Sequence, residues 1–191
     1  DSFGADREAV AMSFNLLDRY MAKELMRSSA PSITRDDYQL FCMTCLYIAV
    51  KVLEPYPRKL SVQTLVDMSK SYYTDEVIEQ TELDILAALD WHIHAPTALS
   101  YTRLFAELFP LPLSMHMTAT MATITEIAVS DSFFVACKPS TIGLAAILHA
   151  ARLNGVHEVQ IQLFQRRVQG LPVLTEEFRS VYQQLEKLYC D

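Results

Sequence analysis

The chain has 191 residues, of which 51% are hydrophobic and only four are glycine, and its formal net charge is −7. This length suits one large or two small folded domains, and the composition excludes a disordered chain. The acidic balance argues against broad electrostatic binding to nucleic acid or anionic membranes. The sequence has no run of 18 apolar residues that could span a bilayer. Because it starts at Asp1 without a signal-peptide pattern, we expect it to begin inside a longer protein.

Residues 7–26 are predicted to form the first helix. Apolar side chains recur there at three- and four-residue steps, which is typical of a helix with one face against a core. We expect five residues to make up this face: Val10, Phe14, Leu17, Met21 and Leu25. A linker containing Pro31 follows at residues 28–32.

Three further helices are predicted in the first half. Thr34, with an aspartate three residues later, has the spacing of a capping box and begins a helix of residues 34–53. A turn at residues 54–58, which contains Pro55 and Pro57, ends it. Ser61 begins a short helix, and Thr74 caps a longer one that lasts to about residue 89.

The second half repeats this layout after a break at residues 91–96. We predict five helices, in residues 97–109, 114–129, 139–153, 156–168 and 175–188. Pro139 occupies a favoured first-turn position, and Gly155 follows the end of the same helix. No strand alternation is present, and a weak echo between the halves favours a duplicated helical bundle. We therefore predict an all-α fold with domains at residues 1–95 and 96–191.

The sequence contains no motif for catalysis or cofactor binding. Cys42 and Cys45 have a C-x-x-C spacing, but no second pair or histidine cluster completes a zinc site, so we interpret them as buried thiols in a reducing compartment. His92 and His94 follow a helix end and are interpreted as loop or packing residues. A glycine-rich phosphate loop, paired carboxylates and a nucleophile–histidine motif are all missing. We therefore expect no enzyme activity, no metal and no cofactor.

Three charged residues interrupt apolar helical stripes in the first half: Asp18, Lys51 and Glu82. Lys51, for example, closes a stripe that contains Leu40, Met43 and Tyr47. A charge in such a stripe is costly unless it is paired or reaches the polar groups of a partner. Each residue alone is explained by a snorkelling or locally paired side chain. Three within one half of the chain weaken that explanation and make these positions the place to look for function.

The first half resembles the cyclin family in ordered segments that extend over about ninety residues. Residues 15–20, N-L-L-D-R-Y, resemble the family signature N-Y-L-D-R-F, and residues 48–51 resemble a helix that ends in A-S-K. Residues 54–57, E-P-Y-P, resemble the following E-x-Y-P turn. The helix that includes residues 82–86 is similar to the next capped helix, and residues 91–97 resemble its exit, F-x-L-x-x-P-T.

The second half, through Lys138-Pro139-Ser140 and Ala145-Ala146, resembles the more divergent C-terminal cyclin fold. The resemblance implies tandem cyclin folds of five helices each, the first lacking its opening helix in this chain, with the pattern most similar to A- and B-type cyclins. In the family, the opening helix carries an arginine that Asp18 would hold. The resemblance therefore assigns structural roles to Asp18 and Leu40. Gln39 matches one position of the family's substrate-docking patch, most of which belongs to the missing helix.

The resemblance also implies a regulatory subunit that binds and allosterically activates a cyclin-dependent kinase in cell-cycle control, in the nucleus and/or cytoplasm. Lys51 and Glu82 would lie together on the kinase-binding face. Four apolar residues would contact the kinase around them: Val52, Leu83, Leu86 and Trp91. We expect a monomer apart from the kinase heterodimer, with no nucleic-acid or membrane partner. The alternative is a cyclin-fold transcription-factor or scaffold module that binds other proteins without activating a kinase.

Overall fold

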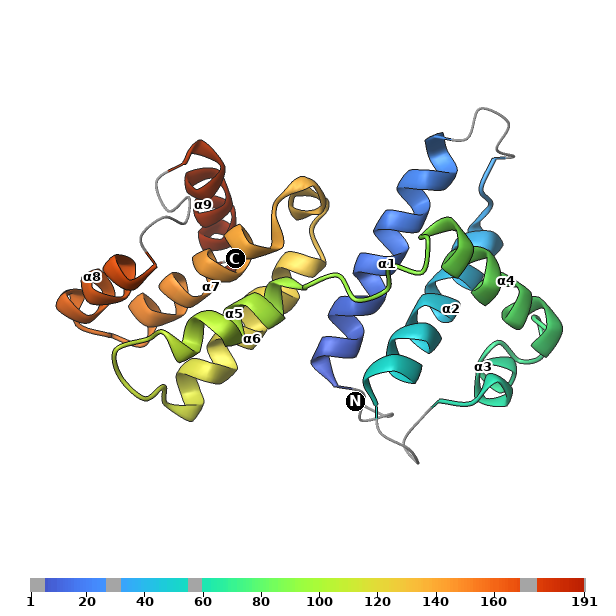
Figure 1. Cartoon of the computed structure of the whole chain (residues 1–191), viewed down its shortest axis with the longest axis horizontal. Coiled ribbons are helices and arrows are strands. Elements are labelled where there is room, and N and C mark those ends of the chain that lie inside the picture. Colours follow the sequence, from blue (N-terminus) through green and yellow to red (C-terminus); the bar gives the residue numbers. More distant parts are fainter. Residues whose placement is uncertain (1–5, 27–31, 55–59, 169–174, 191) are drawn as a thin grey trace. The chain divides into compact units, whose positions relative to one another are not determined.

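The computed structural model describes residues 6–26, 32–54, 60–168 and 175–190, and all regular structure in these ranges is helical. The predicted all-α fold is confirmed. The chain divides into two compact units, residues 1–95 and 96–191, which we call unit 1 and unit 2. Figure 1 shows unit 1 from blue to green and unit 2 from green to red. The first residue Asp1 and the predicted turns at Pro31, Pro55 and Pro57 lie outside the described residues.

The described part of unit 1 contains four helices: α1 (Arg7–Met26), α2 (Arg35–Leu53), α3 (Val62–Met68) and α4 (Asp75–Ala88). The predicted capping box at the start of α2 is confirmed. The Thr34 hydroxyl accepts the Asp37 N–H at 3.2 Å, and the Asp37 carboxylate accepts the Thr34 N–H at 2.9 Å. Ser61 and Thr74 cap α3 and α4 with their side chains, as the sequence indicates.

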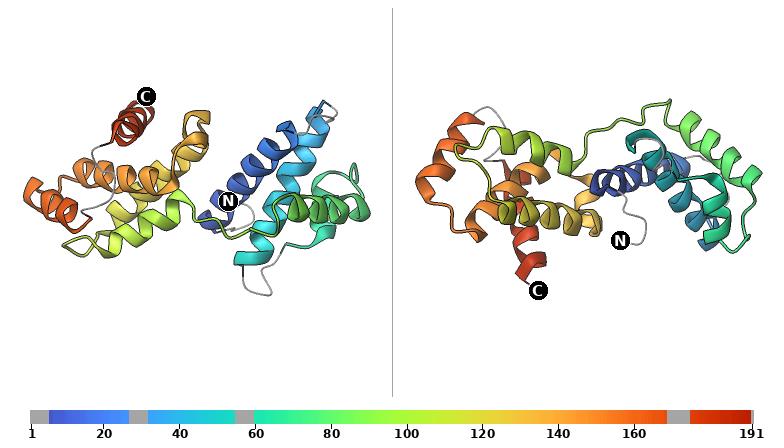
Figure 2. Two further views of the ribbon diagram at one scale, coloured as in Figure 1. Left: turned by 45° about the horizontal axis from the view of Figure 1, so that its top comes forward. Right: turned by 90° about the horizontal axis from the view of Figure 1, so that it is seen from below.

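Helix α2 is the centre of unit 1. Its Ile48 joins Leu16 of α1 and Ile85 of α4 in one buried cluster. Its Leu40 and Tyr47 belong to a second cluster, with residues of α3 and α4. Figures 1 and 2 show α1 running alongside α2. A helix packed in this way carries its last turn, which contains Lys51, to the surface at a fixed place.

The predicted core face of α1 is wrong for most of its residues. Phe14 is 40% exposed and Leu25 is 73% exposed, and Val10 is also exposed. The face that packs against α2 and α4 contains Ala9, Met12, Ser13, Leu16, Leu17 and Tyr20, of which only Leu17 belongs to the predicted set. Both sets satisfy the same three- and four-residue spacing, so α1 has two apolar faces and its neighbours in the described structure bury only one. The stripe that Asp18 interrupts is therefore not a core stripe in this structure.

Unit 2 is built around α7 (Pro139–Leu153), which is buried along most of its length. Four further α-helices complete the described part of this unit: α5 (Ala98–Glu107), α6 (Met115–Val129), α8 (Glu158–Arg167) and α9 (Glu176–Cys190). Helices α5, α6 and α9 contact α7. The predicted start of α7 at Pro139 is confirmed. Sequence reasoning missed a short 3-10 helix, η1 (Ser132–Ala136), because a single turn has no period to detect.

Candidate functional site

The structure brings Lys51 and Glu82 together at the surface of unit 1. The Lys51 ammonium lies 2.6 Å from one carboxylate oxygen of Glu82 and 2.9 Å from the other. The Lys51 side chain comes from the last turn of α2 and is 45% exposed, whereas Glu82, in the middle of α4, is 13% exposed. A partner could therefore contact the lysine side chain directly, because it reaches solvent. The glutamate is largely covered and binds the lysine ammonium.

A third residue completes this arrangement. The ring of Tyr47, one helical turn before Lys51, is buried and lies 4.8 Å from the Lys51 ammonium. Burial works to lower the pKa of Lys51, but the hydrogen bond and charge of Glu82, together with Tyr47, outweigh it and raise this pKa. The lysine is therefore firmly protonated at neutral pH. The sequence analysis placed Tyr47 only in an apolar stripe, although its four-residue spacing from Lys51 could have indicated the contact.

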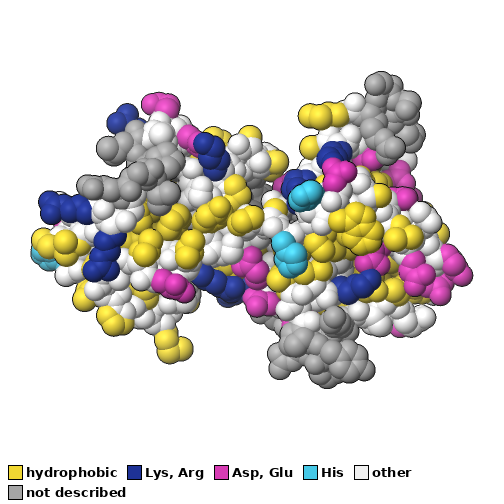
Figure 3. Space-filling model, in the orientation of Figure 1, with side chains coloured by type: hydrophobic (Ala, Val, Ile, Leu, Met, Phe, Trp, Pro, Cys, Tyr) yellow, Lys and Arg dark blue, Asp and Glu magenta, His cyan; other side chains and the backbone are white. Residues whose placement is uncertain are grey.

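Exposed apolar side chains also occur on α4 and on the turn after it. Leu83 is 53% exposed and Trp91 is 65% exposed, while Val52 is half-buried. Figure 3 shows hydrophobic side chains beside histidines and cations on one face of unit 1. Leu86 differs from the other predicted contact residues because it is buried in the core cluster with Leu16 and Ile48. Its main contacts in this structure are with its own unit.

Asp18 does not join the Lys51–Glu82 pair. It is half-buried on α1, where burial raises its pKa, and its charge acts on Tyr38 and Cys45 of α2. Within the described part of the chain, no ion pair or hydrogen bond holds its carboxylate. Leu40 is buried in the cluster between α2 and α3, and Gln39 is exposed beside it.

The cysteines and histidines form no metal centre in the described residues, where no group of three or more potential ligands has a suitable arrangement. Cys45 is buried and Cys42 is half-buried, and both are free thiols. Burial, with smaller contributions from Cys42 and Asp18, raises the pKa of Cys45 to about 12, which leaves it protonated and unreactive. His92 and His94 are exposed. In the same described ranges, no helix has the length and apolar character that crossing a bilayer requires.

A second arrangement that the sequence did not reveal lies where α4 ends. Lys23 of α1 donates hydrogen bonds to the carbonyl of Ala88 and, at 2.9 Å, to the carboxylate of Asp90. Asp90 and Trp91 follow the helix in left-handed backbone conformations. Residues 65 or more positions apart in the chain make these contacts, so no local pattern could have indicated them.

Comparison with known proteins gives consistent results for both sequence and fold. Residues 1–94 match the family described as "Cyclin, N-terminal domain". A G1/S-specific cyclin of Candida albicans is 25% identical over 181 residues, which cover 85% of this chain and 25% of that protein. A G2/mitotic-specific cyclin of Saccharomyces cerevisiae is 24% identical over 155 residues, or 81% of this chain and 29% of that protein. The chain therefore spans less than a third of the length of these two relatives.

The fold is similar to that of a viral cyclin from herpesvirus saimiri. The TM-score is 0.77, and the match covers 98% of this chain and 79% of the viral chain at 19% sequence identity. A likeness at this identity concerns the fold. Since the relatives include both G1/S and mitotic types, the expected similarity to A- and B-type cyclins stays a prediction.

Proposed function

The chain belongs to the cyclin family, and on this premise we propose that it binds a cyclin-dependent protein kinase and activates it allosterically, without chemistry of its own. The observation that carries the proposal is the Lys51–Glu82 pair on the surface of unit 1, which also exposes the side chains of Leu83 and Trp91. Exposed aromatic and large apolar side chains are typical of the core of a protein interface, and a charged pair that becomes buried there needs polar groups of the partner to compensate its lost hydration.

Lys51 is the residue that we propose to contact the kinase directly. A lysine ammonium has three N–H donors, and here two are satisfied by the oxygens of Glu82. In the complex, the third would donate to a main-chain carbonyl of the partner. Glu82 is largely covered, so its role in this proposal is to orient the ammonium and to balance its charge when the interface excludes water.

Activation requires that the chain bind one kinase conformation better than the other. If the surface around Lys51 contacts the kinase regulatory helix only in its active placement, binding shifts the kinase towards that state. The kinase could then complete its own lysine–glutamate pair and order its activation loop. The chain would contribute only the free energy of binding and no catalytic group.

Co-expression with a panel of cyclin-dependent kinases tests this function. We expect one kinase to co-purify with the protein and to phosphorylate a generic substrate. Lys51→Ala should weaken the complex strongly, because removing one member of a charged interface pair costs about 2–5 kcal/mol. Glu82→Gln should have a smaller effect in the same direction. Two matched controls, Lys187→Ala in the last turn of α9 and Glu79→Gln on the exposed face of α4, should leave binding unchanged.

The result distinguishes three interpretations of the site. Binding and activation that are lost in Lys51→Ala would support the proposal. Binding without activation would favour a scaffold. If wild type and Lys51→Ala capture a kinase equally strongly, the kinase-binding site lies elsewhere.

A further inference from the structure

The turn that carries Trp91 has an unusual backbone. Helix α4 ends at Ala88 with Leu89 as its C-cap residue, after which Asp90 and Trp91 have φ values of 53° and 59°. The N–H of Asp90 donates to Ala87 at 3.1 Å, and the N–H of Trp91 donates to Leu86 at 2.9 Å. A glycine or asparagine normally occupies the first left-handed position after a helix, and a bulky aromatic residue in this region is an outlier. Such a conformation persists only where the surroundings enforce it.

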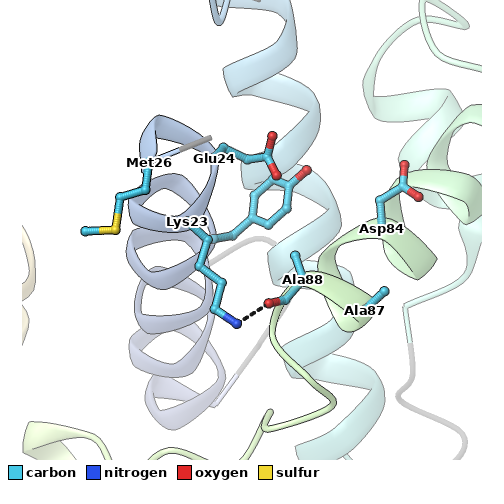
Figure 4. A pocket seen from close by; sticks show the side chains of 7 residues that line it. Lys23, Glu24, Met26, Asp84, Ala87 and Ala88 are labelled. Atoms are coloured by element: carbon cyan, nitrogen blue, oxygen red, sulfur yellow. Dashed lines mark hydrogen bonds between the residues drawn. The ribbon is translucent and has the colours of Figure 1, made fainter. Parts of the chain in front are cut away.

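Besides these backbone hydrogen bonds, Lys23 contacts the turn from a different helix. Its ammonium donates to the carbonyl of Ala88 (Figure 4). It also donates to the carboxylate of Asp90 at 2.9 Å. The Ala88 carbonyl is one of the last carbonyls of α4. These carbonyls accept no hydrogen bond from within the helix, and their partial negative charge attracts a cation. The hydrogen bond and charge of Lys23 also hold the pKa of Asp90 below its usual value. One ammonium therefore fixes both the end of the helix and the first left-handed residue.

The turn after α3 has a similar backbone, with Lys70 and Ser71 at φ values of 54° and 59°. There a local hydroxyl holds the chain, because Ser69 donates to the Val66 carbonyl at 2.8 Å and accepts the Tyr73 N–H at 3.3 Å. In both turns, therefore, a side chain makes hydrogen bonds at or beside the left-handed pair. Only after α4 does that side chain come from another helix, which ties the turn to α1.

The Lys23–Asp90 contact is open to solvent. Surface depressions of about 840 Å³ and about 710 Å³ both include Lys23 in their lining. An exposed ion pair contributes little to stability. We therefore expect the ion pair to affect the position of the turn and not the stability of the whole unit. The residue that follows Asp90 in this turn is Trp91, whose large side chain is 65% exposed.

We propose that Lys23 and Asp90 form a clamp that holds Trp91 in its left-handed conformation, so that the indole is already placed for contact with the partner before binding. This inference rests on the proposed function for its second half, because that function puts Trp91 in the kinase interface. An anchor that is fixed in the free protein loses less freedom on binding, and the partner then binds more tightly. Lys23 and Asp90 are positioning residues in this proposal.

Trp91 is the single tryptophan of the sequence, so its fluorescence reports on the turn directly and without a partner. Lys23→Met keeps the length of the side chain and removes the charge. We expect lower tryptophan anisotropy and stronger acrylamide quenching in this variant, with an unchanged circular dichroism spectrum and melting temperature. High salt should produce the same change in wild type but not in Lys23→Met. Lys187→Met, in the last turn of α9, is the matched control.

A second variant guards against an effect of Lys23→Met on folding. Asp90→Asn removes the charge of the clamp but keeps a residue that tolerates the left-handed conformation. It should raise the mobility of Trp91 in the same direction. Kinase capture by either variant should weaken by about two- to tenfold, the range expected for the loss of one pre-ordered side chain.

The outcomes distinguish the clamp from the proposed function. Unchanged anisotropy and quenching in both variants would overturn the clamp, whatever the kinase result. Mobile Trp91 with unchanged kinase capture, in a protein where Trp91→Ala abolishes capture, would overturn the claim that the clamp prepares the site. If wild type captures no kinase, the proposed function fails. If it captures one and neither Trp91→Ala nor Lys51→Ala affects capture, the kinase-binding site lies elsewhere. In both cases the fluorescence alone decides whether Lys23 holds the turn.

Discussion

Lys51 has two neighbours of different kinds, and each makes a separate prediction. Tyr47 contributes its ring face, 4.8 Å from the ammonium, and no formal charge. An exposed cation–π contact is worth about 0.5–1 kcal/mol. We therefore expect Tyr47→Leu to increase the rate of kinase dissociation by about two- to fivefold, measured by biolayer interferometry. Tyr47→Phe keeps the ring and should resemble wild type. Equal damage from both changes would mean that the hydroxyl, and not the ring, matters.

Glu82 controls the protonation of Lys51. The pKa of Lys51 is raised above its ordinary value of 10.5. The pair therefore stabilises the fold from neutral pH up to that value, and this contribution is lost as pH rises through the folded pKa. NMR titration of the Lys51 side chain should show a lower pKa in Glu82→Gln, while Glu79→Gln should leave it in place. A Lys51 pKa that does not respond to Glu82→Gln would contradict the pairing.

His149 is the buried titratable residue of unit 2. It lies on α7 with its Nδ1 3.3 Å from the hydroxyl of Tyr182 on α9, and its Nε2 has no hydrogen-bond partner within the described residues. Burial lowers its pKa, the nearby Glu186 opposes this, and Arg152 adds to it. The Tyr189 ring also packs against the imidazole. The native state thus favours a neutral His149.

A depressed histidine pKa makes the fold less stable in acid. The unfolded chain takes up a proton near the ordinary value of 6.5, whereas native His149 does so only at lower pH. Stability is therefore full above about pH 6.5 and falls as pH decreases from that value towards the folded pKa. Urea unfolding at about pH 7.5 and about pH 5.5 should show a smaller loss in His149→Gln than in wild type. His116→Gln, at an exposed position on α6, should keep the wild-type loss.

At the scale of the elements, α5 and α7 approach each other at Gly143. A Cβ atom at this position would lie 2.9 Å from the carbonyl oxygen of Ala98 and 2.9 Å from the Cβ of Tyr101. Alanine normally favours a helix over glycine by roughly 0.5–1 kcal/mol. We expect the opposite sign here, a loss of about 1–3 kcal/mol in Gly143→Ala, because backbone atoms must move.

The measurement is the free energy of unfolding in urea. Gly155→Asn is the comparison, since Gly155 has a φ of +66° and open space around its Cα. Asparagine tolerates that conformation, so this change should cost little. A stabilised Gly143→Ala would contradict the close approach of α5 and α7.

Local signals predicted the elements, while tertiary packing decided which faces they bury. Thr34, Ser61 and Thr74 indicated helix starts because a capping hydrogen bond involves residues only three positions apart. The core face of α1 was assigned wrongly because Phe14 and Leu16 lie on different faces that are both apolar. Only the position of α2 and α4 decides between them, and the spacing of apolar residues contains no such information.

The same limit applies to the candidate site. Lys51 and Glu82 could be singled out in the sequence because each is a charge within an apolar helical stripe. The lysine of the clamp could not, since Lys23 lies in an ordinary polar part of α1 and its partners follow the end of α4. Trp91 was singled out by resemblance, whereas its left-handed backbone is a property of the folded chain alone.

For the whole molecule, the charge is distributed unevenly along the sequence. Residues 1–95 contain nine Lys and Arg against fifteen Asp and Glu, whereas residues 96–191 contain seven against eight. The unit with the candidate site therefore has most of the net charge of −7. Binding to a nucleic-acid backbone depends on basic residues that displace counterions, and an acidic unit is repelled instead.

This distribution separates the proposed function from a DNA-binding cyclin-fold module. We expect the chain to pass through a duplex-DNA column at about 0.1 M salt without retention, because repulsion acts at this ionic strength over about 10 Å. A kinase complex formed through Lys51 should survive under the same conditions, since a pair that becomes buried in an interface is screened far less than an exposed charge. Retention on the column that is lost in Lys51→Ala would assign the same lysine to phosphate binding. Flow-through of both proteins, combined with kinase capture by wild type alone, would leave protein binding as the role of this surface.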